Sequence, residues 1–189
     1  MTFSLLASLC LLAAPCSTRT GDAVTSPDGR VVVFVARDAS RTDDSALGRV
    51  PHEDLCVSRA GAPATVLLAG RGEEAGGPEK TLVSFDGLVF SSDSTTLFFT
   101  TTGWVTSPAA HAVELATGKE RFLFDGAIKA PITKGPDAGR YLATHFRLDD
   151  AHPIDSPKYQ GRVETWSIVT ATGQTIRKIS EAEARKWLR

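Results

Sequence analysis

The sequence predicts an all-β protein made of three repeats of four antiparallel strands, followed by a short C-terminal helix. Two observations predict this fold. Three turn-forming clusters each lead directly into a run of β-branched or aromatic residues. Three short loops, with Gly61, Gly118 and Gly173, each join two further apolar runs, and these glycines are 57 and 55 residues apart. Self-similarity at a nearly constant period indicates a repeat architecture.

The first elements of each repeat are a tight turn and the strand that follows it. In the first turn, Pro27 fixes φ, the side chain of Asp28 can bond back to the backbone, and Gly29 tolerates a positive φ. The third turn is one residue longer than the other two. The three turns, each with its strand, are 26–30 with 31–35, 91–95 with 96–100, and 135–140 with 141–144.

The second half of each repeat is a hairpin. Two apolar runs joined by a short glycine-containing loop are the expected signal for such a hairpin. The tripeptide Ala-Thr-Gly recurs at 116–118 and 171–173, which indicates equivalent structural positions. With a short leading strand, each repeat then has four antiparallel strands, as a propeller blade does. The paired runs are 55–58 with 65–68, 112–115 with 121–124, and 166–169 with 175–179.

The best repeat carries a family resemblance. Ser-Pro-Asp-Gly at 26–29, an apolar strand, Asp-Leu-Cys-Val at 54–57 and a glycine hairpin closely resemble the repeats of TolB-type β-propellers, which recur in prolyl-oligopeptidase-like propellers. Repeat two departs from the pattern with Ser92 in place of Pro and Ser94 in place of Gly. The resemblance implies a periplasmic scaffold whose loop-bearing face meets protein partners.

We expect a single propeller-like domain over 22–189. Closed propellers have at least four blades, whereas three repeats are present here. Two chains could close a six-bladed ring as a homodimer, the three sheets could form a compact open stack, or a partner could complete the ring. The predicted parts are repeats at about 22–70, 83–126 and 130–180, with a helix at 181–189.

The terminal helix has its own signals. Ser180 and Glu183 form a capping box, in which Ser180 caps the first turn and Glu183 reaches back to the cap. A helix this short is marginal in water and depends on packing. We therefore expect Trp187 and Leu188 to cover an exposed sheet edge or face.

The N-terminus predicts export. Residues 1–16 begin with an uncharged, Leu- and Ala-rich run and precede an abruptly polar stretch, which is typical of a signal peptide, although the usual basic residues are missing. The expected location is periplasmic or secreted. Lipoprotein anchoring through Cys16 is the less favoured alternative, because Pro15 breaks the lipidation motif, and an N-terminal core element is another. With this leader removed, Cys56 would be an unpaired, small buried residue.

Several function classes are excluded or disfavoured. The formal net charge is −1 and no basic run exists, which argues against nucleic-acid binding. No apolar stretch approaches the length of about 18 residues that a transmembrane helix needs. The nucleophile elbow Gly-x-Ser-x-Gly of a propeller-bearing peptidase is missing. The glycine-rich stretch 70–77 lacks the Lys-Ser/Thr of a phosphate-binding loop and is predicted to be a flexible linker.

Chemistry could reside in two long insertions, 37–53 and 147–161, between the second and third strands of repeats one and three. Equivalent loops of a repeat protein emerge on one face, where binding function is often carried. We therefore predict a non-enzymatic module that binds a protein or cell-envelope component and needs no cofactor. The candidate binding-face residues are Asp43, Asp44, His52 and Trp104.

An alternative is a divalent-metal site in the repeat-three insertion, for metal binding or metal-dependent hydrolysis. Imidazole and carboxylate groups are suitable donors for zinc and other divalent cations. Their spacing matches no established metal motif, and acidic loops are commonly just solvated. The candidate ligands are His145, Asp149, Asp150, His152 and Asp155.

Overall fold

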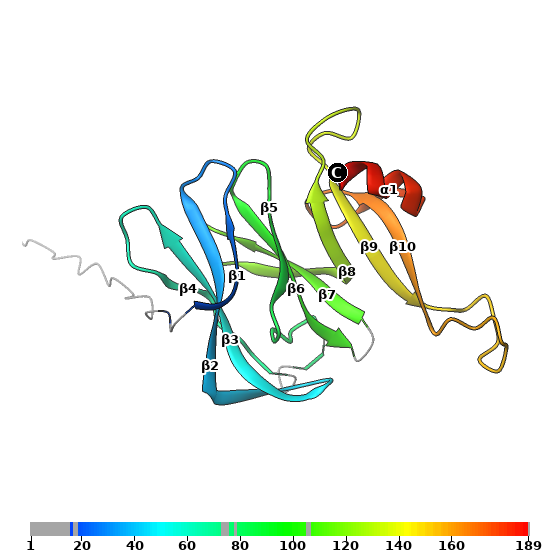
Figure 1. Ribbon diagram of the computed structural model, residues 1–189, viewed down its shortest axis with the longest axis horizontal. Coiled ribbons are helices and arrows are strands. Elements are labelled where there is room, and N and C mark those ends of the chain that lie inside the picture. Colours follow the sequence, from blue (N-terminus) through cyan, green and yellow to red (C-terminus); the bar gives the residue numbers. More distant parts are fainter. Residues whose placement is uncertain (1–15, 17–18, 73–75, 78, 105–106, 189) are drawn as a thin grey trace, which may run out of the picture.

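The structure, a computed structural model, describes residues 16, 19–72, 76–77, 79–104 and 107–188. Over these residues the chain is all-β with one short helix, as the sequence predicts (Figure 1). The first sheet has the strand order β1-β2-β3-β4 and is antiparallel. Its strands are β1 Arg19–Thr25, β2 Val31–Ser45, β3 Gly48–Arg59 and β4 Thr65–Leu68.

The second sheet is also antiparallel and has seven strands, in the order β11-β10-β9-β8-β7-β6-β5. Every neighbour in this order is also a neighbour in sequence, so the sheet is a continuous meander. Its strands are β5 Asp86–Phe90, β6 Thr96–Trp104, β7 Ser107–Glu114, β8 Glu120–Pro131, β9 Tyr141–Leu148, β10 Arg162–Val169 and β11 Thr175–Ile179.

Strand β8 pairs with two different strands along its length. Its first half pairs with β7 and its second half, from Gly126, pairs with β9. Gly126 has a φ of 152°, and a Cβ at this position would collide with the carbonyl oxygen of Thr144. Only glycine fits where the two backbones approach this closely. The strands thus form three four-strand groups: group one (β1–β4), group two (β5–β8) and group three (β8–β11).

The turns confirm that groups one and two share a local structure. The Ser26 hydroxyl donates to Asp28, whose carboxylate accepts from the amide of Arg30. Ser91, Asp93 and Thr95 repeat these bonds in group two. Ser94 has a φ of 60°, close to the 73° of Gly29 at the equivalent position. The turn geometry is therefore kept although serine replaces glycine.

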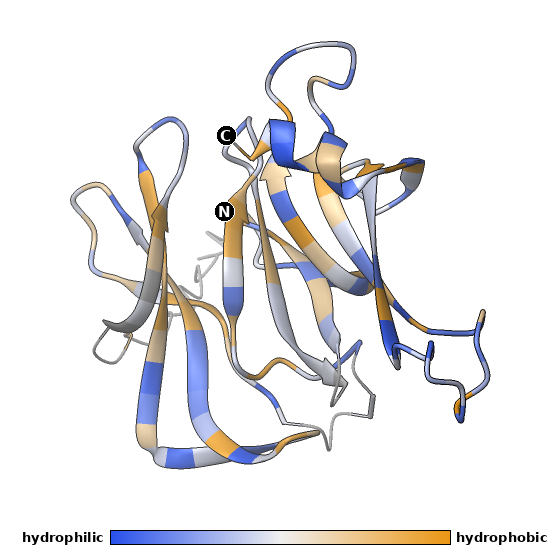
Figure 2. Ribbon diagram, turned by 45° about the vertical axis from the view of Figure 1, so that its right-hand side comes forward, coloured by the Kyte–Doolittle hydropathy of each residue, from blue (hydrophilic) through white to orange (hydrophobic). Residues whose placement is uncertain are grey.

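The core lies between neighbouring groups, as stacked repeats require. Alternate residues of β2 and β3, such as Val33 and Leu55, face group two and pack in a cluster with Phe99. A second cluster around Phe98 and Tyr141 joins groups two and three, and the two rings lie 4.6 Å apart. In Figure 2 the hydrophobic residues concentrate on the strands, while the distal parts of β2 and β3 carry long hydrophilic stretches.

The outer face of group one is closed by a disulfide between Cys16 and Cys56. Cys56 is fully buried beside Phe34 and Ala36 on this face. The expectation that Cys56 is buried is confirmed, and the expectation that it is unpaired is wrong. Sequence reasoning placed Cys16 in the leader, and only the fold brings the two residues, 40 positions apart, to a Cα–Cα distance of 6.1 Å. The rest of the predicted leader, residues 1–15, lies outside the described residues.

Helix α1, Glu181–Trp187, packs against group three. Ser180 is the N-cap and accepts a hydrogen bond from the Glu183 amide, as predicted. The Glu183 carboxylate does not complete the capping box and instead forms a 2.8 Å ion pair with Arg177. The buried contact is made by Ala184, whereas Leu188 is half exposed, contrary to expectation. Within the described part of the chain, no helix is long and apolar enough to cross a membrane.

Candidate functional site

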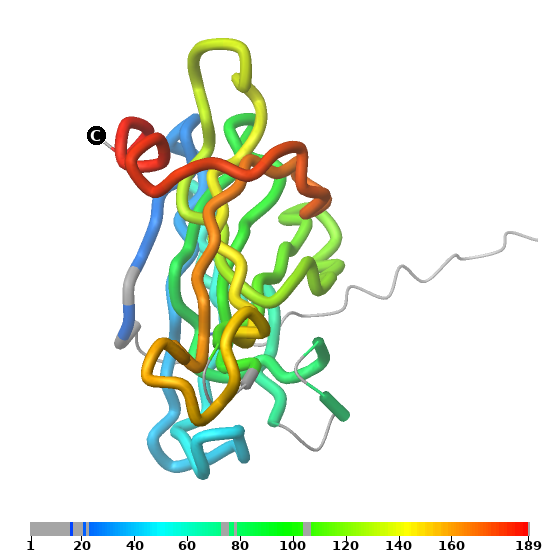
Figure 3. The backbone as a smooth tube through the Cα atoms, turned by 90° about the vertical axis from the view of Figure 1, so that its right-hand side faces the viewer, coloured from blue at the N-terminus to red at the C-terminus, as the bar shows by residue number. Residues whose placement is uncertain are grey.

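Both insertions project toward the same end of the molecule: both lie in the lower part of Figure 3, and in Figure 1 the arm is at the bottom and the β9–β10 loop at the lower right. The first was expected to be a loop over 37–53, and this is wrong. It is a hairpin arm, the distal part of β2 and β3, in which pairing continues to Ser45 and Gly48 across a shift between Asp38 and Thr42. The second insertion is an irregular loop over 149–161, closed where Leu148 pairs with Arg162.

An imidazole with two acidic neighbours lies at the base of the arm. His52 Nδ1 is 2.7 Å from Asp43 and its Nε2 is 3.2 Å from Asp54. The ring is 4% exposed. Because each ring nitrogen already faces a carboxylate, neither is free to bind a ligand. Of the predicted binding-face residues, His52 and Asp43 therefore serve the arm, and Asp44 is exposed beside Arg49.

A buried carboxylate joins the arm to group two. Glu53 accepts two hydrogen bonds from Arg37, at 2.9 and 2.5 Å, and one from the Phe85 amide at 3.0 Å. Its side chain is almost fully buried. Burial of a charge is tolerated when it is paired and hydrogen-bonded in this way. Glu53 thus fixes the base of the arm on the segment that leads into β5.

The start of the glycine-rich stretch is held in the same manner. The Gly70 amide donates to Asp54 at 2.9 Å. Arg71 forms an isolated antiparallel bridge with Leu82. Residues 70 and 71 are therefore bonded to neighbouring segments, while 73–75 lie outside the described residues and the flexibility of the stretch stays a prediction.

Asp149 organises the second insertion. Its carboxylate accepts hydrogen bonds from the amides of Gln160 and Ala151, at 3.0 and 3.1 Å, and lies 3.0 Å from His152 Nδ1. These bonds, the one from Gln160 foremost, lower the pKa of Asp149. The side chain is 3% exposed. The Asp149 side chain therefore closes the loop by bonding to backbone amides of other loop residues.

The other predicted metal ligands are dispersed. His145 lies in β9 with its ring 4.2 Å from that of Phe124, and burial lowers its pKa. Asp150 forms an ion pair with Arg147, and Asp155 is exposed. Only Asp149 and His152 come together. In the described ranges no three His, Cys, Asp or Glu side chains converge as metal ligands, and metal binding stays a prediction.

A second histidine network, which the sequence did not indicate, lies between β6, β7 and β8. The Thr101 hydroxyl is 3.2 Å from His111 Nε2, and His111 Nδ1 is 2.7 Å from Glu120. Burial of Glu120 opposes its ionisation, but the hydrogen bonds and charges of His111 and Arg71 outweigh it and lower the pKa of Glu120. No sequence signal links these residues, because the partners lie nine, ten and 49 positions apart.

This order of groups is that of a hydroxyl–imidazole–carboxylate catalytic triad. Thr101 is 2% exposed and His111 is 0% exposed, so substrate cannot reach the hydroxyl. The hydroxyl also lies 3.1 Å from the Thr81 carbonyl oxygen, to which it donates. We therefore assign the network to fastening the segment before β5 onto group two.

The surface of the two insertions is marked by exposed aliphatic side chains. Leu47 at the tip of the arm is 64% exposed, and Leu148 and Ile154 in or beside the loop are 70% and 81% exposed. Trp104, expected in a loop, is the last residue of β6, and its side chain lies outside the described residues. The exposed large hydrophobic residues of the described chain are Leu47, Phe122, Leu148, Ile154, Ile176 and Leu188.

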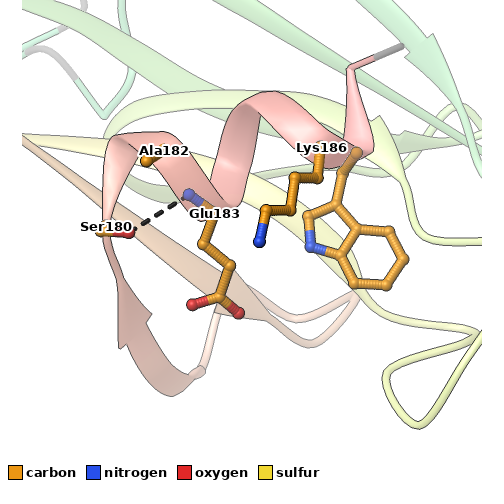
Figure 4. A pocket seen from close by; sticks show the side chains of 5 residues that line it. Ser180, Ala182, Glu183 and Lys186 are labelled. Atoms are coloured by element: carbon orange, nitrogen blue, oxygen red, sulfur yellow. Dashed lines mark hydrogen bonds between the residues drawn. The ribbon is translucent and has the colours of Figure 1, made fainter.

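Three surface pockets, all lined by described residues, lie away from both insertions. One, of about 600 Å³, is lined by helix residues, including Glu183 and Lys186; Figure 4 shows the Ser180 hydroxyl bonded to the Glu183 amide at its side. Another, of about 360 Å³, lies between β5 and β8, with Asp86 and Lys129 among its lining residues. Neither contains a nucleophile with an adjacent base.

No protein-family model and no curated protein sequence matches the chain. Among solved structures, it is similar to the acylaminoacyl peptidase of Pyrococcus horikoshii, with 13% identity over 84% of this chain and 24% of that one, and a TM-score of 0.48. TolB from Acinetobacter baumannii has 11% identity over 82% and 32% of the two chains, with a TM-score of 0.45. A prolyl endopeptidase has 15% identity over 84% and 28%, with a TM-score of 0.41. The chain thus spans about a quarter to a third of the length of these proteins.

Proposed function

We propose that this chain is an exported, non-enzymatic, propeller-like module that binds a protein or cell-envelope component through the end that carries the two insertions. One observation carries the proposal. Two segments more than 100 residues apart in sequence project from the same end, and each presents an exposed aliphatic residue, Leu47 or Ile154.

The way the two insertions are held supports this role. Glu53 and His52 fix the base of the arm with buried hydrogen bonds, and Asp149 fixes the loop. A binding surface held in one conformation loses less entropy on association than a mobile one. Rigid scaffolds that carry function on their loops are common among repeat proteins.

The blade count is part of the proposal. Groups one, two and three correspond to three blades of the TolB-type repeat, and their first strands are neighbours, since β1 contacts β5 and β5 contacts β8. Three blades form an open arc. A second copy of the chain is one way to complete a ring. Light scattering across a concentration range tests this, because a stable mass of two chains supports closure and a monomer at every concentration excludes it.

Site-specific crosslinking tests the binding end. A photoreactive residue replaces Leu47 or Ile154 in the full chain, which is then irradiated with an envelope fraction. Thr172, exposed in the β10–β11 turn at the opposite end, is the control position. One shared crosslinked partner from positions 47 and 154, without a product from position 172, supports the proposal. Equal crosslinking from all three positions, or none from the two tips, contradicts it.

A further inference from the structure

Cys16 has two mutually exclusive chemical fates in an exported chain. As the first residue of a lipoprotein its sulfur would carry a thioether-linked lipid, whereas as a half-cystine the same sulfur is bonded to Cys56. We propose that Cys16 is retained and oxidised, so that the leader is cut upstream of it and Cys16 is not a lipid anchor. This inference rests on the proposed export.

The position of Cys56 supports oxidation. It lies in β3, opposite Phe34 of β2, and is fully buried on the outer face of group one. Cys16 packs against the same cluster with Ala64 and Val66. Its Cα lies 6.1 Å from that of Cys56, within the range that disulfides span.

The backbone around Cys16 holds it in this place. The Cys16 amide donates to the carbonyl oxygen of Ala64, at 3.5 Å, in the connection between β3 and β4. Three residues later, Arg19 begins the pairing of β1 with β2, opposite Ala36. Residue 16 is therefore held in place as part of group one. A cut after residue 16 would remove one half of the disulfide.

The pairing is unambiguous once a leader has been removed upstream of residue 16. The chain has three cysteines, and Cys10 lies within the apolar run. Removal of that run leaves Cys16 and Cys56 alone. One thiolate attacks the disulfide of a thiol oxidoreductase, and the second displaces it from the mixed disulfide; the oxidoreductase leaves as a dithiol that has gained the two electrons and two protons.

The bond has a structural consequence at the open end of the stack. A terminal repeat has no neighbour on its outer side and needs another way to cover it. On group one the covalently held residue 16 lies over the apolar outer face, and on group three helix α1 packs against the sheet. Disulfides persist in oxidising compartments outside the cytosol, which agrees with the proposed export.

The test uses the full chain with its own N-terminus, expressed in a bacterium that exports and oxidises proteins. Intact mass and N-terminal sequencing are measured on the processed protein before and after reduction. We expect an N-terminus between residues 11 and 16, no acyl mass, and a gain of about 2 Da on reduction, for two hydrogens. Cys56→Ser should leave Cys16 reactive toward a maleimide. Cys10→Ser is the matched control and should give the same processed mass as the parent.

Three results would overturn the inference alone: an acylated Cys16, a cut that removes Cys16, or two free thiols in the exported chain. Each of them leaves the proposed export and the crosslinking test intact. Retention of the uncleaved, reduced chain in the cytoplasm would overturn the inference together with export.

Discussion

The two insertions occupy the same position in repeats one and three, but they fold differently. The first continues the strands β2 and β3 as a paired arm, and the second leaves the sheet as a loop. Proline explains part of the difference. Pro153 and Pro157 interrupt the loop and cannot donate to a strand ladder, whereas Pro51 of the arm lies in β3 at a register shift.

The two insertions also use their buried acids differently. In the arm, Glu53 and Asp54 bond to Phe85 and Gly70, which belong to the connection between groups. In the loop, Asp149 bonds to amides of the loop itself. The arm is thus coupled to packing between groups one and two, while the loop is a local unit that can open alone. Four predictions test this contrast.

Loss of the Glu53 carboxylate should have the largest effect. Glu53→Ala leaves the buried Phe85 amide and the Arg37 guanidinium without their acceptor. We expect the free energy of unfolding to fall by about 2–4 kcal/mol, measured by urea denaturation. Glu164→Ala, at an exposed position of β10, is the control. A loss below about 0.5 kcal/mol for Glu53→Ala would mean that the arm is not coupled to the core.

Removal of the His52 ring should have the next largest effect. His52→Ala removes the imidazole that lies within hydrogen-bonding distance of the carboxylates of both Asp43 and Asp54. We expect a loss of about 1–2 kcal/mol in the same measurement. The control is Asp44→Ala. Asp44 follows Asp43 in sequence and is exposed, so this variant should change the free energy of unfolding by less than about 0.5 kcal/mol. Equal losses in the two variants would show that the buried position of His52 is unimportant.

Asp149 should act locally and depend on pH. Its folded pKa is lowered below the ordinary value of 3.8, so its carboxylate stabilises the loop at neutral pH and loses this effect as the pH falls through the folded pKa. We expect Asp149→Ala at neutral pH to speed amide exchange at Gln160 and Ala151 while the core strands keep their protection. Asp150→Ala is the control. Faster exchange throughout group three would contradict a local role.

The aliphatic tips should have the smallest effect on stability. Leu47→Ser and Ile154→Ser should each change the free energy of unfolding by less than about 0.5 kcal/mol, because both side chains are exposed. Each should nevertheless reduce the yield of the partner crosslinked through the other tip. Ile176→Ser, at an exposed residue of β11, should leave that yield unchanged. If neither substitution lowers the crosslinking yield, the insertions are not part of the binding surface.

The turns and the glycine hairpins could be predicted from the sequence because they are local. Ser26, Asp28 and Gly29 lie within four residues, and their bonds depend on the chain next to them. Group two keeps this turn even with Ser94 at a positive φ. The helix start at Ser180 was predictable for the same reason. The all-β class follows from these local signals together.

The tertiary structure decided what depends on distant residues. The disulfide joins Cys16 to Cys56, and Glu53 meets Phe85 across 32 positions. The candidate metal ligands are dispersed because the His145 ring lies against Phe124 in a strand, while Asp149 bonds to amides of the loop. Residues close in sequence alternate between the two faces of a strand, while distant ones meet across packed sheets. Local order was thus encoded in the sequence, and the convergence of side chains was decided by the packing of the three groups.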